Sequence, residues 1–452
     1  MATPEKGEKQ APQRPASIMD ADVESTGRLE AKPTNDTVSP IINFKTLTWW
    51  QGGIVLVAET VSLGILSLPK VIASVGLVPG IILILIMSGL STWSGLMLGE
   101  FRKEYPHVEN FGDAVEVIGK SIGMGPLFQE IFGWAQVLFQ VFVMGAHLLT
   151  WTICLDALRG GGVCKIIWAV IGLVVFALLN LPRTLKLTSW TSITSCLSIT
   201  IATLLTVGYV GTNKAPDVVV EITKVVPFTT AFLGVTNIAV AFSSHSCFFG
   251  VIGEFKNPED WPKALALLQI IDTSLYLIAA IVIYVYVGKD VPAPALLAAT
   301  DFKWHIAIWA IAIPTIVIAG VIYGHVAAKY VFGRIFRNSK HLVHRTKRST
   351  IVWVAMIFAM WAVALVIAES IPIFDSLLGL LAALFVSWFS YGLPGIFWLW
   401  MHHGNWTSSP ARAAKFTANI LLVITGVMVC ALGLWASVES IIESETGKPW
   451  AC

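Results

Sequence analysis

Charged residues are scarce in this chain. Asp, Glu, Lys and Arg make up 13% of the 452 residues, whereas the apolar types make up 56%. A soluble globular chain is about one quarter charged. The mean hydropathy of +0.74 points the same way. This composition excludes an ordinary soluble protein, so many of the apolar side chains must face lipid.

Motifs of enzymes and ATP-driven pumps are also missing. The sequence has no phosphate-binding Gly-x-x-x-x-Gly-Lys loop, no His-Glu-x-x-His pair and no serine elbow with plausible partners. We therefore expect no catalytic residues, no cofactor and no metal site. Any active transport by such a protein would have to draw on an ion gradient.

Cysteine and net charge add little. Of the six cysteines, only Cys154 and Cys164 flank a single short loop, which makes them the candidate disulfide pair. The net charge of +2 comes without a basic face bearing stacking aromatics. A nucleic-acid partner is therefore not expected.

The first 45 residues differ from the rest of the chain. They mix Pro, Lys, Glu, Asp, Ser and Thr without periodicity and contain no apolar core of the kind that a secretory signal needs. Such a composition is typical of disorder. We predict a disordered cytoplasmic tail over 1–45.

Apolar runs long enough to cross a bilayer occupy most of the remaining sequence. A transmembrane helix needs about 20 mostly apolar residues. We predict an all-α membrane protein whose membrane domain covers 46–440, followed by a short extracytoplasmic C-terminus over 441–452. The eleven predicted spans are 49–75, 78–101, 127–156, 163–181, 189–211, 227–255, 264–288, 303–331, 350–370, 374–401 and 413–437.

The basic residues predict the orientation. With the N-terminus inside, the cytoplasmic loops hold sixteen Lys and Arg, and the outer segments hold eight. Seven of the sixteen lie between the eighth and ninth spans. Because cytoplasmic loops carry the excess of positive charge, the N-terminus is predicted to be cytoplasmic.

The first span is interrupted near its middle. Small, hydroxyl-bearing and β-branched residues gather there, followed by a proline, in the run Glu59-Thr60-Val61-Ser62-Leu63-Gly64-Ile65-Leu66-Ser67-Leu68-Pro69. In a helix Gly costs about 1 kcal/mol against Ala, and Pro about 3 kcal/mol. This stretch can unwind, and a new helical segment near Leu66 would offer free N–H groups to a carboxylate.

The sixth span contains the counterpart. Three serines and a histidine lie at the centre of an otherwise apolar run, Ala241-Phe242-Ser243-Ser244-His245-Ser246-Cys247-Phe248-Phe249-Gly250. Polar groups at this depth are expensive in lipid. They either form a functional site or bond back to their own and neighbouring helices. Two interruptions at corresponding places in two halves favour a transporter's central site.

Ionisable residues within the spans have either a role in transport or a structural role. Glu59 either takes up a proton during transport, with or without pairing to His245, or makes a structural hydrogen bond that holds the break closed. A lone intramembrane histidine, such as His147 or His325, is more often a packing residue. Asp272 is interpreted as an interhelical contact.

At the two interruptions the sequence resembles the amino acid/auxin permease family, whose members share the amino acid transporter transmembrane domain, in its fungal neutral amino acid permease branch. The residues that carry the resemblance are Gly64-Ile65-Leu66-Ser67-Leu68-Pro69, Phe242-Ser243-Ser244-His245 and Glu254-Phe255-Lys256-Asn257-Pro258. The resemblance implies a leucine-transporter-like fold with a 5+5 inverted repeat and proton-coupled uptake of amino acids. Members usually have Gly-x-Gly where this chain has Ser62-Leu63-Gly64, so a narrower pocket or an added hydroxyl ligand is expected.

The working hypothesis is secondary active symport of neutral, and more narrowly bulky or aromatic, amino acids with protons. In relatives that couple to sodium, hydroxyls of the eighth span face the first span. This chain has no Ser or Thr between Ala319 and Ala328, so the resemblance favours protons over sodium. The substrate would bind Ser62, Leu63, Gly64, Ile65 and Leu66 through its carboxylate, and Phe242, Ser243 and Ser244 through its amino group, with Leu63, Phe242 and Phe248 around its side chain. Glu59 and His245 would carry the proton.

Two other functions stay open on sequence alone. One is an amino acid sensor without net transport, and the other is an exporter of a modified amino acid or secondary metabolite. The expected partners are a small-molecule amino acid, the proton and the lipid bilayer. The plasma membrane is favoured, with the vacuolar membrane as the alternative.

Overall fold

A computed structural model describes residues 47–183, 188–214, 218–337, 339–343, 346–444, 449–450 and 452. The predicted tail, 1–45, lies outside these residues, as does part of the predicted C-terminal segment. The described chain is almost entirely helical.

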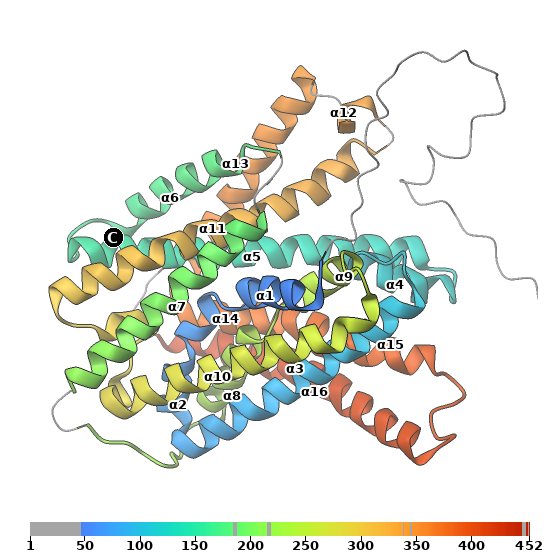
Figure 1. Ribbon diagram of the computed structural model, residues 1–452. Helices are drawn as coiled ribbons and strands as arrows, with labels where there is room; N and C mark the ends of the chain where they lie inside the picture. Colours follow the sequence, from blue (N-terminus) through green and yellow to red (C-terminus); the bar gives the residue numbers. More distant parts are fainter. Residues whose placement is uncertain are drawn as a thin grey trace, which may run out of the picture. The chain divides into compact units, whose positions relative to one another are not determined.

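The predicted spans correspond to helices (Figure 1). The first consists of α1 (Trp49–Thr60) and α2 (Leu68–Val75), and the sixth of α8 (Phe228–Ala241) and α9 (His245–Gly253). The other membrane helices are α3 (Leu77–Glu104), α5 (Gly125–Arg159), α6 (Lys165–Asn180), α7 (Thr188–Thr212), α10 (Trp261–Val287), α11 (Phe302–Ile335), α13 (Lys347–Ser370), α14 (Phe374–Leu381) with α15 (Leu393–Met401), and α16 (Pro410–Glu443).

Nine helical stretches in the described part of the chain are long and apolar enough to cross a membrane, and the bent pair α1–α2 makes a tenth. The remaining predicted span, 163–181, corresponds to α6, an apolar helix of 16 residues. The predicted fold class, an all-α membrane protein with breaks in its first and sixth spans, is confirmed.

The first break is sharp. Helix α1 ends at Thr60, a 3₁₀ turn covers Leu63–Leu66, and the axes on either side differ by 49°. The turn is stabilised locally, because the Ser67 hydroxyl donates to the Gly64 carbonyl at 2.9 Å. The second break is gentler: Phe242–Ser244 separate α8 from α9, and these helices together form one apolar span.

The tenth span is irregular as well. Between α14 and α15 the chain is π-helical over Ala382–Gly392. Such stretches are rare and occur mainly near functional sites. Helices α8 and α14 pack directly against each other, which brings the tenth span to the second break.

A short helix absent from the sequence prediction, α4 (Phe111–Lys120), packs along α5. Its N-cap is Asn110, whose side chain accepts a hydrogen bond from the Asp113 backbone N–H at 3.1 Å. The Asp113 carboxylate accepts in turn from the Gln129 amide at 3.3 Å. Burial raises the pKa of Asp113, although hydrogen bonds to its carboxylate from the Glu109 backbone N–H and the Gln129 amide oppose the rise.

The start of α1 is tied to the end of α9. The Leu47 N–H donates to the Glu254 carbonyl at 3.0 Å, and the Lys256 N–H donates to the Leu47 carbonyl at 2.9 Å. The Phe255 ring fills the space beside Gly52, where a Cβ atom would lie 2.1 Å from it. We call the two backbone hydrogen bonds of Leu47 the Leu47 bridge. The bridge holds the N-terminal end of the first span against the C-terminal end of the sixth.

Candidate functional site

A cavity lies where the two breaks face each other. The cavity volume, measured as the space open to the centres of water molecules, is about 50 Å³. One water molecule needs about 10–15 Å³ on the same measure. Residues from α1, α5, α8, α11, α14 and both breaks form its wall: Glu59, Thr60, Ser62, Leu63, Gly64, Phe139, Val143, Ala146, His147, Val240, Ser243, Ser244, Tyr323, Leu378 and Leu381.

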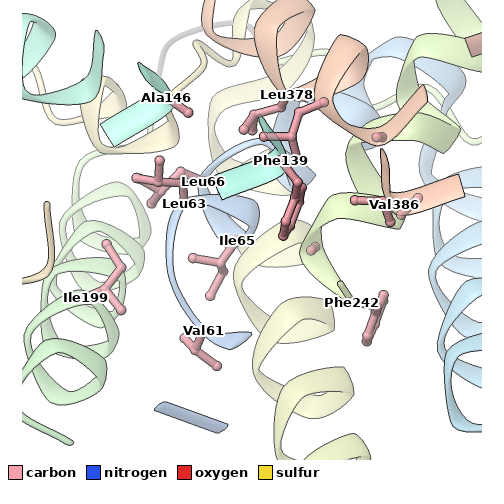
Figure 2. Packing of buried hydrophobic residues seen from close by; sticks show 14 of the residues in the cluster. Val61, Leu63, Ile65, Leu66, Phe139, Ala146, Ile199, Phe242, Leu378 and Val386 are labelled. Atoms are coloured by element: carbon pink, nitrogen blue, oxygen red, sulfur yellow. The ribbon is translucent and has the colours of Figure 1, made fainter. Parts of the chain in front are cut away.

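The first break contributes three of the predicted binding residues. Ser62, Leu63 and Gly64 line the cavity, whereas Ile65 and Leu66 are buried in the apolar packing beside it. Figure 2 shows Leu63, Ile65 and Leu66 gathered around the turn. The Ser62 hydroxyl is buried and has no hydrogen-bond partner among the described residues. It is therefore available to a bound solute.

The second break contributes Ser243 and Ser244. The Ser243 hydroxyl donates to the Val240 carbonyl at 2.7 Å, so its proton is already used in a hydrogen bond within its own segment. Phe242 is buried away from the cavity wall, with its ring 5.1 Å from that of Tyr276. The predicted pocket residue Phe242 thus supports the break from behind in this conformation.

Helix α3 holds the second break in place. The Ser91 hydroxyl donates to the Phe242 carbonyl at 3.2 Å, and the Gln269 amide donates to Ser91 at 3.0 Å. The imidazole Nε2 of His245 lies 2.6 Å from the Ser94 hydroxyl. His245 therefore faces α3 and is not part of the cavity wall. Its role here is to anchor the start of α9.

Phe248 also lies outside the cavity. It is fully buried, with its ring 4.6 Å from the His245 imidazole and 4.9 Å from the Trp261 indole. The same face of α9 thus carries both residues toward α3 and α10. Neither touches the cavity in this conformation.

One hydroxyl joins the two breaks. Tyr276 on α10 lies 2.9 Å from the Ala241 carbonyl, where α8 ends, and 3.3 Å from the Thr60 carbonyl, where α1 ends. The last carbonyls of a helix have no partner within that helix. Because a hydroxyl donates one proton, the two carbonyls share it.

Glu59 is on the cavity wall at the end of α1. Its carboxylate accepts a hydrogen bond from the Ser192 hydroxyl of α7 at 2.6 Å. Glu59 and His245, which we predicted could pair, are thus held by different helices. Glu59 borders the cavity, and His245 does not.

Several cavity residues were not in the predicted site. Phe139 and His147 come from α5, Tyr323 from α11 and Leu378 from α14. Figure 2 shows Phe139 beside Leu378. His147 and Tyr323 stand out in sequence as polar residues within apolar spans, but Phe139 and Leu378 carry no such signal.

The disulfide differs from the predicted candidate. Cys164 is bonded to Cys452, and Cys154 is a buried free thiol. The candidate pair does not form because Cys154 lies within α5, with its sulfur 3.9 Å from the Trp309 carbonyl of α11. Figure 1 places the C-terminus beside the end of α5 and the start of α6.

The sequence matches a known family along nearly its whole membrane part. The model of the family described as "Transmembrane amino acid transporter protein" matches residues 45–439. The chain belongs to this family. It is accordingly a multi-pass membrane transporter of amino acids and not an enzyme.

Relatives of this family member share its length. The "N amino acid transport system protein" of Neurospora crassa is 27% identical over 423 residues, which cover 90% of this chain and 89% of that protein. A "Transmembrane transporter" of Fusarium pseudograminearum is 26% identical over 416 residues, covering 90% and 86%.

A similarity was also found among solved structures, to one described as "Substrate-bound outward-open state of a Na+-coupled sialic acid symporter reveals a novel Na+-site". The TM-score is 0.49 at 12% identity, with 87% of this chain and 90% of that one covered.

Proposed function

We propose that this transporter carries neutral amino acids across its membrane by symport with protons. The observation that supports the proposal best is that both helix breaks open on one cavity, with Ser62 to Gly64 on one side and Ser243 and Ser244 on the other. Unwound backbone at membrane depth is tolerated where it lines such a cavity.

The charge of the cavity wall favours a neutral side chain. Among the described residues that line it there is no Lys or Arg, and Glu59 is the only one with a carboxyl group. An acidic side chain would find no counter-ion there, and burial of an unpaired charge is costly. A zwitterion brings its own compensating charges, which the polar groups of the two breaks can bind.

The backbone assignment follows from the same geometry. The α-carboxylate would lie against the Ser62–Leu66 turn, whose free N–H groups and Ser62 hydroxyl are donors. The α-amino group would approach the carbonyls of Phe242–Ser244 and the Glu59 carboxyl. The side chain would meet the apolar surface of Leu63, Phe139 and Leu378. Bulky or aromatic side chains require this surface to move apart, because about 50 Å³ is too little for them.

For the proton, Glu59 is placed at the cavity and is the carrier closest to the substrate. His245 would act from behind the second break, through α3. The membrane domain is proposed to cover 46–440, with the tail over 1–45 on the cytoplasmic side and the segment over 441–452 on the extracytoplasmic side. The Cys164–Cys452 disulfide supports this orientation, because disulfides persist outside the reducing cytosol. The plasma membrane is the proposed location.

The test is uptake into proteoliposomes. The purified protein is supplied with labelled neutral amino acids of increasing size, under an inward proton gradient, an inward sodium gradient or no gradient. The proposal predicts accumulation with the proton gradient alone, and its loss on adding a protonophore. Accumulation driven by sodium, or by neither gradient, would contradict proton symport.

A further inference from the structure

Asp272 is a buried carboxyl group that the proposed transport cycle has not used. It lies on α10, is 0% exposed, and neither carboxylate oxygen has a hydrogen-bond partner among the described residues. An ionised carboxylate in such a place loses its hydration and gains nothing in return. Such surroundings favour the neutral, protonated form of this carboxyl group.

Among the described residues, the helices packed around Asp272 offer no charge that could replace the proton. The titratable groups that face it are the Cys196 thiol of α7 and the Tyr276 phenol of its own helix. Helix α3 contacts α10 near Asp272 through uncharged groups: the Ser88 hydroxyl lies 2.6 Å from the Thr273 hydroxyl. On α1 the one carboxyl group, Glu59, is engaged by α7 and faces the cavity. Helix α2 also packs on α10, and its only charged residue is Lys70, which stays half-buried.

Asp272 is also one helical turn from the hydroxyl that joins the breaks. Tyr276 follows it by four positions, so both side chains lie on the same face of α10. The Tyr276 hydroxyl is occupied by the carbonyls of Thr60 and Ala241. To lose its proton, Asp272 must gain water or take this donor. Tyr276 can donate to Asp272 only after it releases the two carbonyls through which α10 is bonded to the ends of α1 and α8.

We propose that Asp272 is a proton-binding site that controls the closing of α1, α8 and α10 around the cavity, with Tyr276 as the positioning residue that links it to both breaks. The inference rests on the proposed proton symport. In the cycle, an O–H bond forms at one carboxylate oxygen with a proton from the water on the loading side. That bond breaks when the carboxyl is hydrated from the other side, and the proton leaves with the water.

The test compares Asp272→Asn with wild type in proteoliposomes. Asn keeps the size and neutrality of the protonated acid but cannot release a proton. The proposal predicts that proton-driven accumulation falls at least about tenfold, while exchange of labelled for unlabelled substrate without a gradient persists. A pH-sensitive dye inside the vesicles should show proton entry with wild type and not with the variant. Asp290→Asn, an exposed change just beyond the end of α10, is the matched control.

Each other outcome is also informative. Accumulation and proton entry at wild-type levels in Asp272→Asn would overturn the inference and leave proton symport standing. If wild type itself ignores the proton gradient, the proposed function fails first. Should Asp272→Asn not fold, Asp272→Glu keeps a titratable group in a different position. A shift in the pH of half-maximal uptake is then expected, and an unchanged pH profile would overturn the proposal.

Discussion

Gly64 is where the two breaks touch. A Cβ atom added there would lie 2.5 Å from the Cα atom of Ala241, a distance that real Cβ contacts do not show. The obstacle is backbone, so it cannot rotate away as a side chain can. The glycine is thus required for the close approach of the unwound turn to the end of α8, in addition to any part in binding the substrate.

Gly64→Ala should therefore reduce transport strongly. Forcing one methyl group into a packed site costs about 1–3 kcal/mol, and the strain falls on the cavity wall. We expect the initial rate of uptake to fall by about tenfold or more with normal insertion into the membrane. Gly250→Ala is the matched control, because a Cβ atom there meets nothing within 4 Å. Equal activity of the two variants would contradict this role of Gly64.

For single residues, the sequence showed where polar groups interrupt the spans, but not which neighbouring helix their side chains face. The hydroxyls and glycine of the first break stood out because they interrupt an apolar run, and Ser62 and Gly64 do line the cavity. His245 stood out for the same reason, yet it faces Ser94 on α3. Helical periodicity fixes which face a side chain occupies. Helical periodicity cannot predict which way a side chain points once the helix is interrupted.

Among the elements, the Leu47 bridge is the contact that closes the ends of the first and sixth spans against each other. It consists of two backbone hydrogen bonds, and the adjoining Phe255 ring is fully buried against α1. The sequence marked Glu254 to Pro258 only as residues that carry the family resemblance. It did not predict the strand-like partner, because a single paired residue leaves no periodic pattern.

Leu47→Pro should weaken this contact. Proline removes the N–H that donates to the Glu254 carbonyl, and one such hydrogen bond contributes about 0.5–1.5 kcal/mol. We expect uptake to slow by about two- to tenfold, because the closed arrangement becomes less populated. Leu47→Ala keeps the N–H and serves as the control. The measurement is the initial rate of uptake, and a Pro variant as fast as the Ala variant would rule out a gating role for the bridge.

The long helices were predictable and the short one was not. Length and hydropathy define a membrane span almost uniquely, and the predicted spans agree with the helices to within a few residues at most ends. Helix α4 has only ten residues and a mixed composition. Its stability comes from packing on α5 and from the Asn110 cap, which depend on the folded structure.

For the whole molecule, charge and disulfide give independent accounts of orientation. The seven basic residues between the eighth and ninth spans predict a cytoplasmic loop. The Cys164–Cys452 bond favours an outer location for the α5–α6 connection and the C-terminus. Both agree with a cytoplasmic N-terminus. The disulfide itself could not be read from the sequence, because its cysteines are 288 positions apart.

A membrane-impermeant maleimide tests the orientation. On intact cells it should add to Cys164 and Cys452 only after reduction, and Cys452→Ser should make Cys164 reactive without reduction. Cys430→Ser is the control, since Cys430 is a free thiol within α16. Labelling that needs permeabilised cells would place these cysteines inside and reverse the topology.

The central claim is that an amino acid binds between the two helix breaks. The most direct measurement is a structure of the protein determined with a transported neutral amino acid. We predict density for its carboxylate beside Ser62 and Gly64, and for its amino group beside Ser243 and Ser244. Density for the amino acid anywhere else, with this cavity empty, would contradict the account.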